Sequence, residues 1–116
     1  MAFLSIILIS CSKVKDSYVV SVDHKELQFS LREKEKELKI ISSGEWHIQA
    51  DGIDYFYGGN AGYTDWYKIS PVSGMNNATV VIMLKEEIVI PSPKISALKI
   101  IGKNNVEFVT LKYSDD

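Results

Sequence analysis

The sequence lacks several features that define specialised protein classes. One cysteine in 116 residues excludes an intramolecular disulfide and a cysteine-rich metal centre. Only seven glycines and three prolines exclude collagen-like and low-complexity chains. Basic residues total 13 against 15 acidic ones and form no block, which argues against a nucleic-acid partner because phosphates require a clustered positive surface.

What remains fits one folded domain. Hydrophobic residues make up 46% of the chain, an ordinary share for a globular protein that excludes intrinsic disorder. The length is sufficient for one hydrophobic core and gives no sign of a second.

The N-terminal segment differs from the rest. Residues 2–10 form an uncharged apolar run that ends at Cys11. This run is far below the roughly 20 residues that span a bilayer, but it matches the apolar part of a secretory signal, about 7–15 residues. The segment Leu8-Ile9-Ser10-Cys11 resembles the lipobox of bacterial lipoproteins. That resemblance implies a signal peptide over residues 1–10 and a lipid such as palmitate on Cys11, which would anchor the protein to the cell envelope, most simply at the outer membrane.

Two features leave this interpretation open to an alternative. No lysine or arginine precedes Lys13, although a signal normally begins with positive charge, so a longer signal could extend beyond the given start. Residues 3–9 could instead form a buried first strand, with Cys11 as a small core residue. The polar stretch after Cys11 favours a tether. We therefore expect a tether and lead-in strand over residues 11–24 and a folded domain over 25–113.

The remainder has the pattern of a β-protein. Leu38 and Ile40 alternate with Lys39 and Ile41, as in a half-buried strand. Runs of β-branched and aromatic residues recur every 8–12 residues between turn formers, a spacing typical of a sandwich or barrel. Expected strands are 18–22, 26–30, 37–42, 46–50, 53–57, 66–70, 78–84, 95–101 and 106–113, with turns at Ser43-Gly44, Asp51-Gly52 and Ser73-Gly74. The alternating charges of residues 33–37 have no apolar stripe, and we expect a charged hairpin there.

A family resemblance extends over about three quarters of the chain. Trp46, the block Asp65–Gly74 (Asp-Trp-Tyr-Lys-Ile-Ser-Pro-Val-Ser-Gly) and the closing strand Val106–Leu111 resemble the BACON domain, a Bacteroidetes-associated domain often found N-terminal to carbohydrate-active modules. The resemblance implies an immunoglobulin-like β-sandwich of about seven strands. The chain departs from the family in its last strand and in the stretch Glu86–Pro93.

The two tryptophans are expected in the core. Trp46 and Trp66 fall in separate predicted strands and could meet across the sandwich, where a buried indole supplies a large contact area. Pro71 is expected to end a strand because it has no N–H to donate.

No arrangement typical of an enzyme is present. His47 alternates with apolar neighbours and is expected to face outward, and His24 falls in a turn. No phosphate loop, nucleophile elbow or paired histidines occur. Asp51, Asp54 and Asp65 have no calcium-loop spacing. We expect no catalytic residues, no metal and no cofactor.

The strongest binding signature lies in residues 53–66, where aromatic residues mix with Gly, Asn and Asp. Aromatic rings stack on sugars and polar side chains bond their hydroxyls, which favours a glycan site. The alternative is that the aromatics pack in the core and the glycines only turn the chain. The candidate ligand-binding residues are Tyr55, Tyr57, Asn60, Tyr63 and Asp65.

The sequence therefore predicts a non-enzymatic, lipid-anchored envelope module that binds or displays something at the cell surface. A polysaccharide or a glycoprotein glycan such as mucin is the leading ligand class. The alternative is a structural spacer or a protein interaction domain within an outer-membrane assembly, with an outer-membrane protein as partner.

Overall fold

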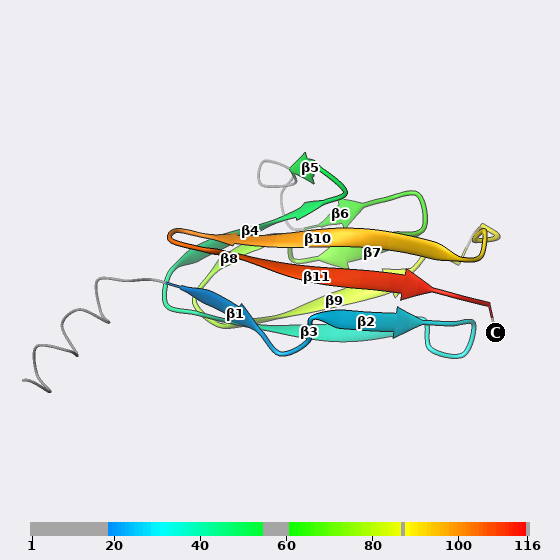
Figure 1. Ribbon diagram of the computed structural model, residues 1–116, viewed down its shortest axis with the longest axis horizontal. Helices are drawn as coiled ribbons and strands as arrows, with labels where there is room; N and C mark the ends of the chain where they lie inside the picture. Colours follow the sequence, from blue (N-terminus) through cyan, green and yellow to red (C-terminus); the bar gives the residue numbers. More distant parts are fainter. Residues whose placement is uncertain (1–18, 55–60, 87, 116) are drawn as a thin grey trace, which may run out of the picture.

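The computed structural model describes residues 19–54, 61–86 and 88–115 (Figure 1). Within these ranges the regular structure is entirely β, as predicted, and no helix there has the length and hydrophobicity to cross a bilayer. The strands are β1 (Val20–Val22), β2 (Glu26–Phe29), β3 (Glu35–Ser42), β4 (Glu45–Ala50), β5 (Ile53–Asp54), β6 (Gly62–Tyr63), β7 (Tyr67–Ser70), β8 (Ser73–Met75), β9 (Ala78–Leu84), β10 (Lys94–Gly102) and β11 (Val106–Tyr113).

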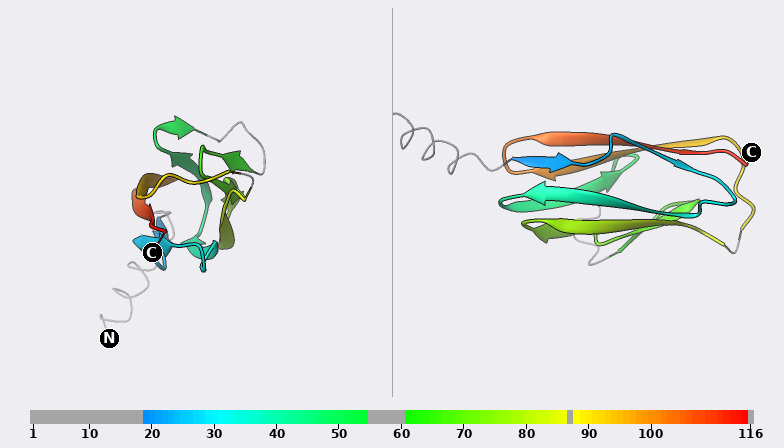
Figure 2. Two further views of the ribbon diagram at one scale, coloured as in Figure 1. Left: turned by 90° about the vertical axis from the view of Figure 1, so that its right-hand side faces the viewer. Right: turned by 90° about the horizontal axis from the view of Figure 1, so that it is seen from below.

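The strands form two sheets that curl around a common interior, as the end-on view in Figure 2 shows. The first sheet has the order β1-β3-β9-β7-β6, and the second has β2-β11-β10-β4-β5 with β8 also paired to β4. The two layers make a β-sandwich in which each sheet covers the apolar face of the other.

Alternating side chains build the core. Along β9, β10 and β11 every second residue is buried and its neighbours are partly or fully exposed. Each buried aliphatic or aromatic side chain contributes about 1.5–3 kcal/mol relative to an exposed one. The inward set of these strands is Val80, Ile82, Leu84, Ser96, Leu98, Ile100, Val109, Leu111 and Tyr113.

The first two strands close both sheets. β1 pairs antiparallel with β3 in the first sheet, and β2 then pairs parallel with β11 in the second. The Asn105 side chain holds the start of β1, because it accepts from the Val20 N–H at 2.8 Å and donates to the Val20 carbonyl at 2.9 Å. The chain thus enters the sandwich at the end where β10 turns into β11 (Figure 1).

The charged segment does not form the predicted hairpin. Ser30 and Glu33 close a tight turn through reciprocal backbone hydrogen bonds, and the Ser30 hydroxyl also accepts from the Glu33 N–H. From Glu35 onward the chain belongs to β3. The prediction was wrong because β2 and β3 lie in different sheets, so this segment crosses between layers.

Both tryptophans are core residues, each 2% exposed, as predicted. They do not meet, however. Trp46 lies opposite Gly102 at one end of β10, whereas the Trp66 ring contacts Tyr113, which lies opposite Lys94 at the other end. The eight-residue separation along β10 (102 − 94) corresponds to about 26 Å at roughly 3.3 Å per residue.

The predicted turn at Ser73-Gly74 is instead part of β8, which pairs with β4. The turn falls at Asn76, whose φ is 67° and whose carbonyl accepts from the Trp46 indole N–H at 2.9 Å. A Cβ on Gly74 would lie 2.8 Å from Cζ2 of Trp46. Glycine is therefore required by the close approach of the indole and not by a turn.

Candidate functional site

The predicted binding segment connects the two sheets. It leaves the second sheet after β5 and enters the first sheet at β6. Tyr55, Tyr57 and Asn60 lie outside the described residues, as does Cys11. Tyr63 and Asp65 are described, and the site is built from them.

Tyr63 lies on the β6–β7 hairpin beside the turn Asp65-Trp66. The Thr64 hydroxyl donates to the Tyr67 carbonyl at 3.0 Å and accepts from the Tyr67 N–H at 3.1 Å, which closes this turn. Trp66 points into the core, and its ring meets those of Phe29, Tyr67 and Tyr113. Tyr63 faces outward and is 62% exposed.

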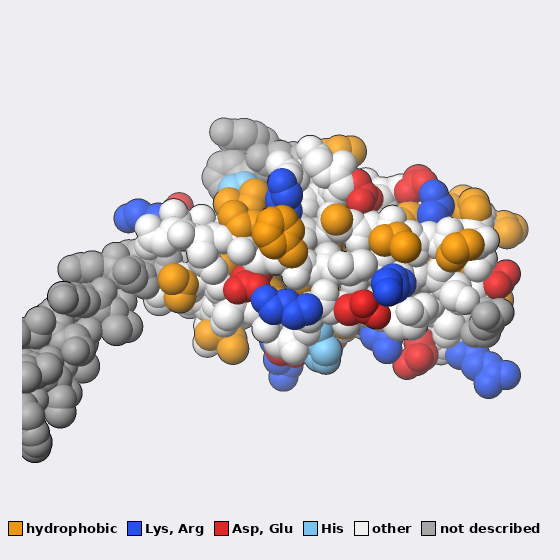
Figure 3. All heavy atoms as spheres, viewed as in Figure 1, with side chains coloured by type: hydrophobic (Ala, Val, Ile, Leu, Met, Phe, Trp, Pro, Cys, Tyr) orange, Lys and Arg blue, Asp and Glu red, His pale blue; other side chains and the backbone are white. Residues whose placement is uncertain are grey.

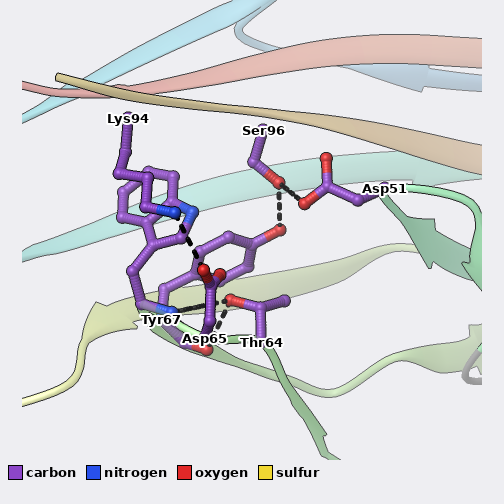
Figure 4. Close-up of polar contacts among 7 residues, drawn as sticks. Asp51, Thr64, Asp65, Tyr67, Lys94 and Ser96 are labelled. Atoms are coloured by element: carbon purple, nitrogen blue, oxygen red, sulfur yellow. Dashed lines mark hydrogen bonds and ion pairs between the residues drawn. The ribbon is translucent and has the colours of Figure 1, made fainter. Parts of the chain in front are cut away.

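Asp65 joins the hairpin to the second sheet. Lys94 Nζ donates to Asp65 Oδ2 at 2.8 Å, and Lys94 is the first residue of β10 (Figure 4). The hydrogen bond from Lys94 lowers the pKa of the Asp65 carboxyl below its usual value, and the positive charge of Lys85 adds to the effect. The carboxylate is thus held ionised and directed at Lys94.

A chain of hydrogen bonds crosses the interior beside this pair (Figure 4). The buried Tyr67 hydroxyl lies 2.8 Å from Ser96 Oγ, and Ser96 Oγ donates to Asp51 Oδ2 at 2.5 Å. Asp51 Oδ1 also accepts from the Ala97 N–H at 2.9 Å. Since Ser96 donates to Asp51, the Tyr67 hydroxyl is the donor to Ser96. The first half of β10 therefore holds the chain on both sides of the binding segment.

Asp51 has this role because of its place in a turn. Asp51 and Gly52 have φ values of 49° and 84°, the positive pair of a type I′ hairpin that Asp-Gly favours. This confirms the turn predicted there. The turn connects β4 to β5 and directs the Asp51 carboxylate to Ser96. Among the described residues no three His, Cys, Asp or Glu side chains gather as a metal site.

A hollow of about 320 Å³ lies on the outer side of the first sheet beside Tyr63. Tyr63 is the direct cross-strand partner of Lys68, and Lys68 is that of Met83. The Lys85 N–H donates to the Trp66 carbonyl at 3.0 Å, which fixes Lys85 beside the turn of the hairpin. The lining residues are Tyr63, Lys68, Met83, Leu84, Lys85 and Glu86. We call this site the Tyr63 hollow.

The sequence interpretation included Tyr63 but not Lys68 or Lys85. The signal for Lys68 was present, since a two-residue turn at Asp65-Trp66 places residues 63 and 68 opposite each other. Lys85 had no such local signal, because its position depends on the pairing of β7 with β9.

A larger hollow of about 670 Å³ lies at the other end of the sandwich. The turns between β3 and β4 and between β10 and β11 contribute to its lining, together with Met75 and half-buried His47. The Trp46 ring borders it but is 2% exposed, so this hollow offers a ligand no aromatic face comparable to that of Tyr63. The Tyr63 hollow is the better candidate.

Comparisons with known proteins define the fold and no more. No family model and no curated protein sequence matches the chain. The chain is similar to part of the structure of a Bacteroides ovatus GH5 xyloglucanase in complex with a XXXG heptasaccharide, with a TM-score of 0.62 and 17% identity over 86% of this chain and 19% of that one. It is also similar to the periplasmic chaperone SfaE, with a TM-score of 0.58 and 12% identity over 84% of this chain and 58% of that one. The chain thus spans about a fifth of the first protein and less than two thirds of the second.

Proposed function

We propose that the protein is a non-catalytic, lipid-anchored module of the bacterial cell envelope that binds glycans in the Tyr63 hollow. The observation that carries the proposal is the outward Tyr63 ring beside a hollow with polar walls. An exposed aromatic face stacks on a sugar ring, while neighbouring ammonium and carboxylate groups bond its hydroxyls. The chain is similar in fold to part of a xyloglucanase whose structure contains a heptasaccharide, and this similarity favours a glycan as the ligand.

The proposal includes an immunoglobulin-like fold of the BACON type. Immunoglobulin domains have the sheet orders A-B-E-D and C-F-G. Assigning the letters A to G in chain order to β1, β3, β4, β7, β9, β10 and β11 reproduces both orders. Trp46 then lies on strand C, where such domains carry a buried tryptophan.

The environment of Ser96, the serine that most resembles a nucleophile, favours a binding role over catalysis. Ser96 and Asp51 resemble two members of a serine-hydrolase triad, but Ser96 is 1% exposed and donates to Asp51 instead of to a base. His24 pairs with Asp23 in an exposed turn, and His47 lies on the outer face of the second sheet. No described imidazole is placed to activate Ser96.

Glycan binding is tested with the full chain carrying Cys11→Ala, which cannot be lipidated, on an array of neutral and acidic polysaccharides. Tyr63→Ala should weaken binding about tenfold, since an aromatic contact contributes about 0.5–1.5 kcal/mol beyond its buried area. Phe108→Ala is the matched control, because Phe108 is 60% exposed on the other sheet. Absence of binding to every glycan, or equal loss in both variants, contradicts the proposal.

The anchor has a separate test. Lipid on Cys11 should keep the wild-type chain in the membrane fraction, because each buried CH₂ of an acyl chain contributes about 0.8 kcal/mol. Cys11→Ala should release the protein. A wild-type chain found outside the membrane fraction would refute the anchor while leaving the glycan site untouched.

A second function is favoured by the outer face of the second sheet. Figure 3 shows hydrophobic side chains along β10 and β11. The exposed hydrophobic residues of these two strands are Ile95, Val106 and Phe108. The solvent face of an antiparallel sheet is normally polar, and an apolar patch there marks a contact surface. The module could therefore be a spacer or a protein interaction domain. Crosslinking in cells to an outer-membrane protein, abolished by Phe108→Asp and retained by Tyr63→Ala, would support it.

A further inference from the structure

We infer that the Tyr63 hollow selects an acidic sugar, one that carries a carboxylate or a sulfate. This inference rests on the glycan binding proposed above. It concerns which glycans the hollow accepts.

The charges around the hollow leave an excess of positive charge. Lys68 and Lys85 line the hollow together with one carboxylate, Glu86. Lys85 also acts on Asp65, but Asp65 is hydrogen-bonded to Lys94 at 2.8 Å. Among the residues that line the hollow, two ammonium groups thus face one carboxylate (2 − 1 = +1). Neither Lys68 nor Lys85 has an ion pair within the described part of the chain.

The geometry places the positive charge beside the stacking surface. As direct cross-strand partners, Tyr63 and Lys68 have Cβ atoms about 4.5–5.5 Å apart. A sugar stacked on Tyr63 therefore brings its ring substituents within reach of Lys68. The backbone of Lys85 is fixed by its bond to Trp66, which places a second ammonium at the same hollow. An anionic substituent makes charge-assisted hydrogen bonds, which are about twice as strong as those of a hydroxyl.

The net charge of the whole chain is negative, so an acidic glycan would have to be bound by the lysines of the hollow and not by the protein's overall charge. The formal net charge is −2, so the protein as a whole repels polyanions. Binding of an acidic glycan would therefore depend on particular lysines and weaken with salt, since screening is nearly complete beyond about 8–10 Å at physiological ionic strength.

The test uses the full chain with Cys11→Ala and two matched pairs of ligands. Polygalacturonate is compared with its methyl ester, and dextran sulfate with dextran, so that each pair differs in charge on one backbone. The variants are Lys68→Gln and Lys85→Gln, singly and together. Lys39→Gln is the control, because Lys39 is exposed and lies on β3 of the same sheet, outside the hollow lining.

We expect binding to an acidic member of at least one pair, with at least tenfold weaker binding to its neutral partner. The double variant should lose about tenfold in affinity for the acidic ligand, whereas Lys39→Gln should stay within twofold. The pair that responds distinguishes carboxylate from sulfate. Equal binding of charged and neutral partners, or equal losses with Lys39→Gln, overturns the inference and leaves glycan binding standing. No binding to any glycan, neutral or acidic, overturns the proposed function itself.

Discussion

Gly74 lies against the indole of Trp46, and this contact determines which residue the position accepts. A Cβ there would lie 2.8 Å from Trp46 Cζ2. Gly74→Ala should therefore lower the free energy of unfolding by about 1–3 kcal/mol, the usual cost of overpacking. Chemical denaturation measures the effect. Phenylalanine lacks the part of the indole that contains Cζ2. In a Trp46→Phe background the same change should therefore cost less. An equal cost in both backgrounds would show that the indole is not the cause.

Ser96 connects two groups that would otherwise lose a partner. Ser96→Ala removes the acceptor of the buried Tyr67 hydroxyl and one donor to Asp51. Each hydrogen bond lost costs about 0.5–1.5 kcal/mol, so the variant should unfold at lower denaturant concentration. In the Ser96→Ala background, Tyr67→Phe should cost less than it does in the wild type, because the hydrogen bond between the two side chains is already lost. Fully additive losses in the double variant would argue against the hydrogen-bond chain.

Residue identity alone predicted part of the site. The sequence proposed Tyr63 and Asp65 by their aromatic and polar surroundings; Tyr63 lines the hollow, whereas Asp65 is bonded to Lys94 and does not line it. The assignment of Trp46 and Trp66 to the core by size is confirmed. The sequence did not identify Lys94 as the partner of Asp65, since the two residues are 29 positions apart and meet only through tertiary packing. Local pattern determines which residues are buried, while contacts between sheets depend on strand pairing.

At the scale of elements, the predicted strand bounds match the observed ones best where the alternating pattern is long. β9 and β11 were predicted with their observed bounds, because seven or eight residues of alternation specify a strand. β6 and β8 were missed, since each contains a glycine and has only two or three residues. Such strands form because a longer neighbour, β7 or β4, pairs with them.

The attachment of β1 depends on one amide side chain. Asn105→Ala removes both hydrogen bonds to Val20, each contributing about 0.5–1.5 kcal/mol. Hydrogen exchange should accelerate at Val20–Val22 while β2, which pairs separately with β11, stays protected. Asn104→Ala in the same turn is the control. Equal protection of β1 in the Asn105→Ala variant and the wild type would show that pairing with β3 suffices.

The ion pair between Asp65 of the β6–β7 hairpin and Lys94 of β10 should contribute to stability in a pH-dependent way. The pKa of Asp65 in the fold lies below its usual 3.8, so its contribution is complete above that value and is lost as pH falls through the lower folded pKa. At pH 7, Asp65→Asn should reduce the free energy of unfolding by a few tenths of a kcal/mol, because exposed pairs contribute only about 0.2–1 kcal/mol. The gap from wild type should close below pH 3.8. A gap that persists in acid would assign the effect to something other than ionised Asp65.

Across the whole molecule, the chain entry and the Tyr63 hollow lie at opposite ends. On β3, Ser42 pairs with Val20 near the entry, and Glu35 pairs with Met83 beside the hollow. Seven residues of β3 (42 − 35) separate them, about 23 Å at roughly 3.3 Å per residue. A tether at the N-terminus would thus leave the hollow at the far end of the domain, a position suited to a ligand outside the membrane.

The same long sandwich contains one continuous core, and its two tryptophans report on the two ends. Buried residues of both sheets form one cluster that includes Trp46 and Trp66. We therefore expect one cooperative unfolding transition, as small domains usually show. Single-tryptophan variants, Trp46→Phe and Trp66→Phe, allow fluorescence to follow each end while circular dichroism follows the strands. Within each variant the urea midpoints from both methods should coincide, with a slope of about 1–3 kcal/mol/M. An earlier fluorescence midpoint in one variant would show that the end containing its remaining tryptophan unfolds separately.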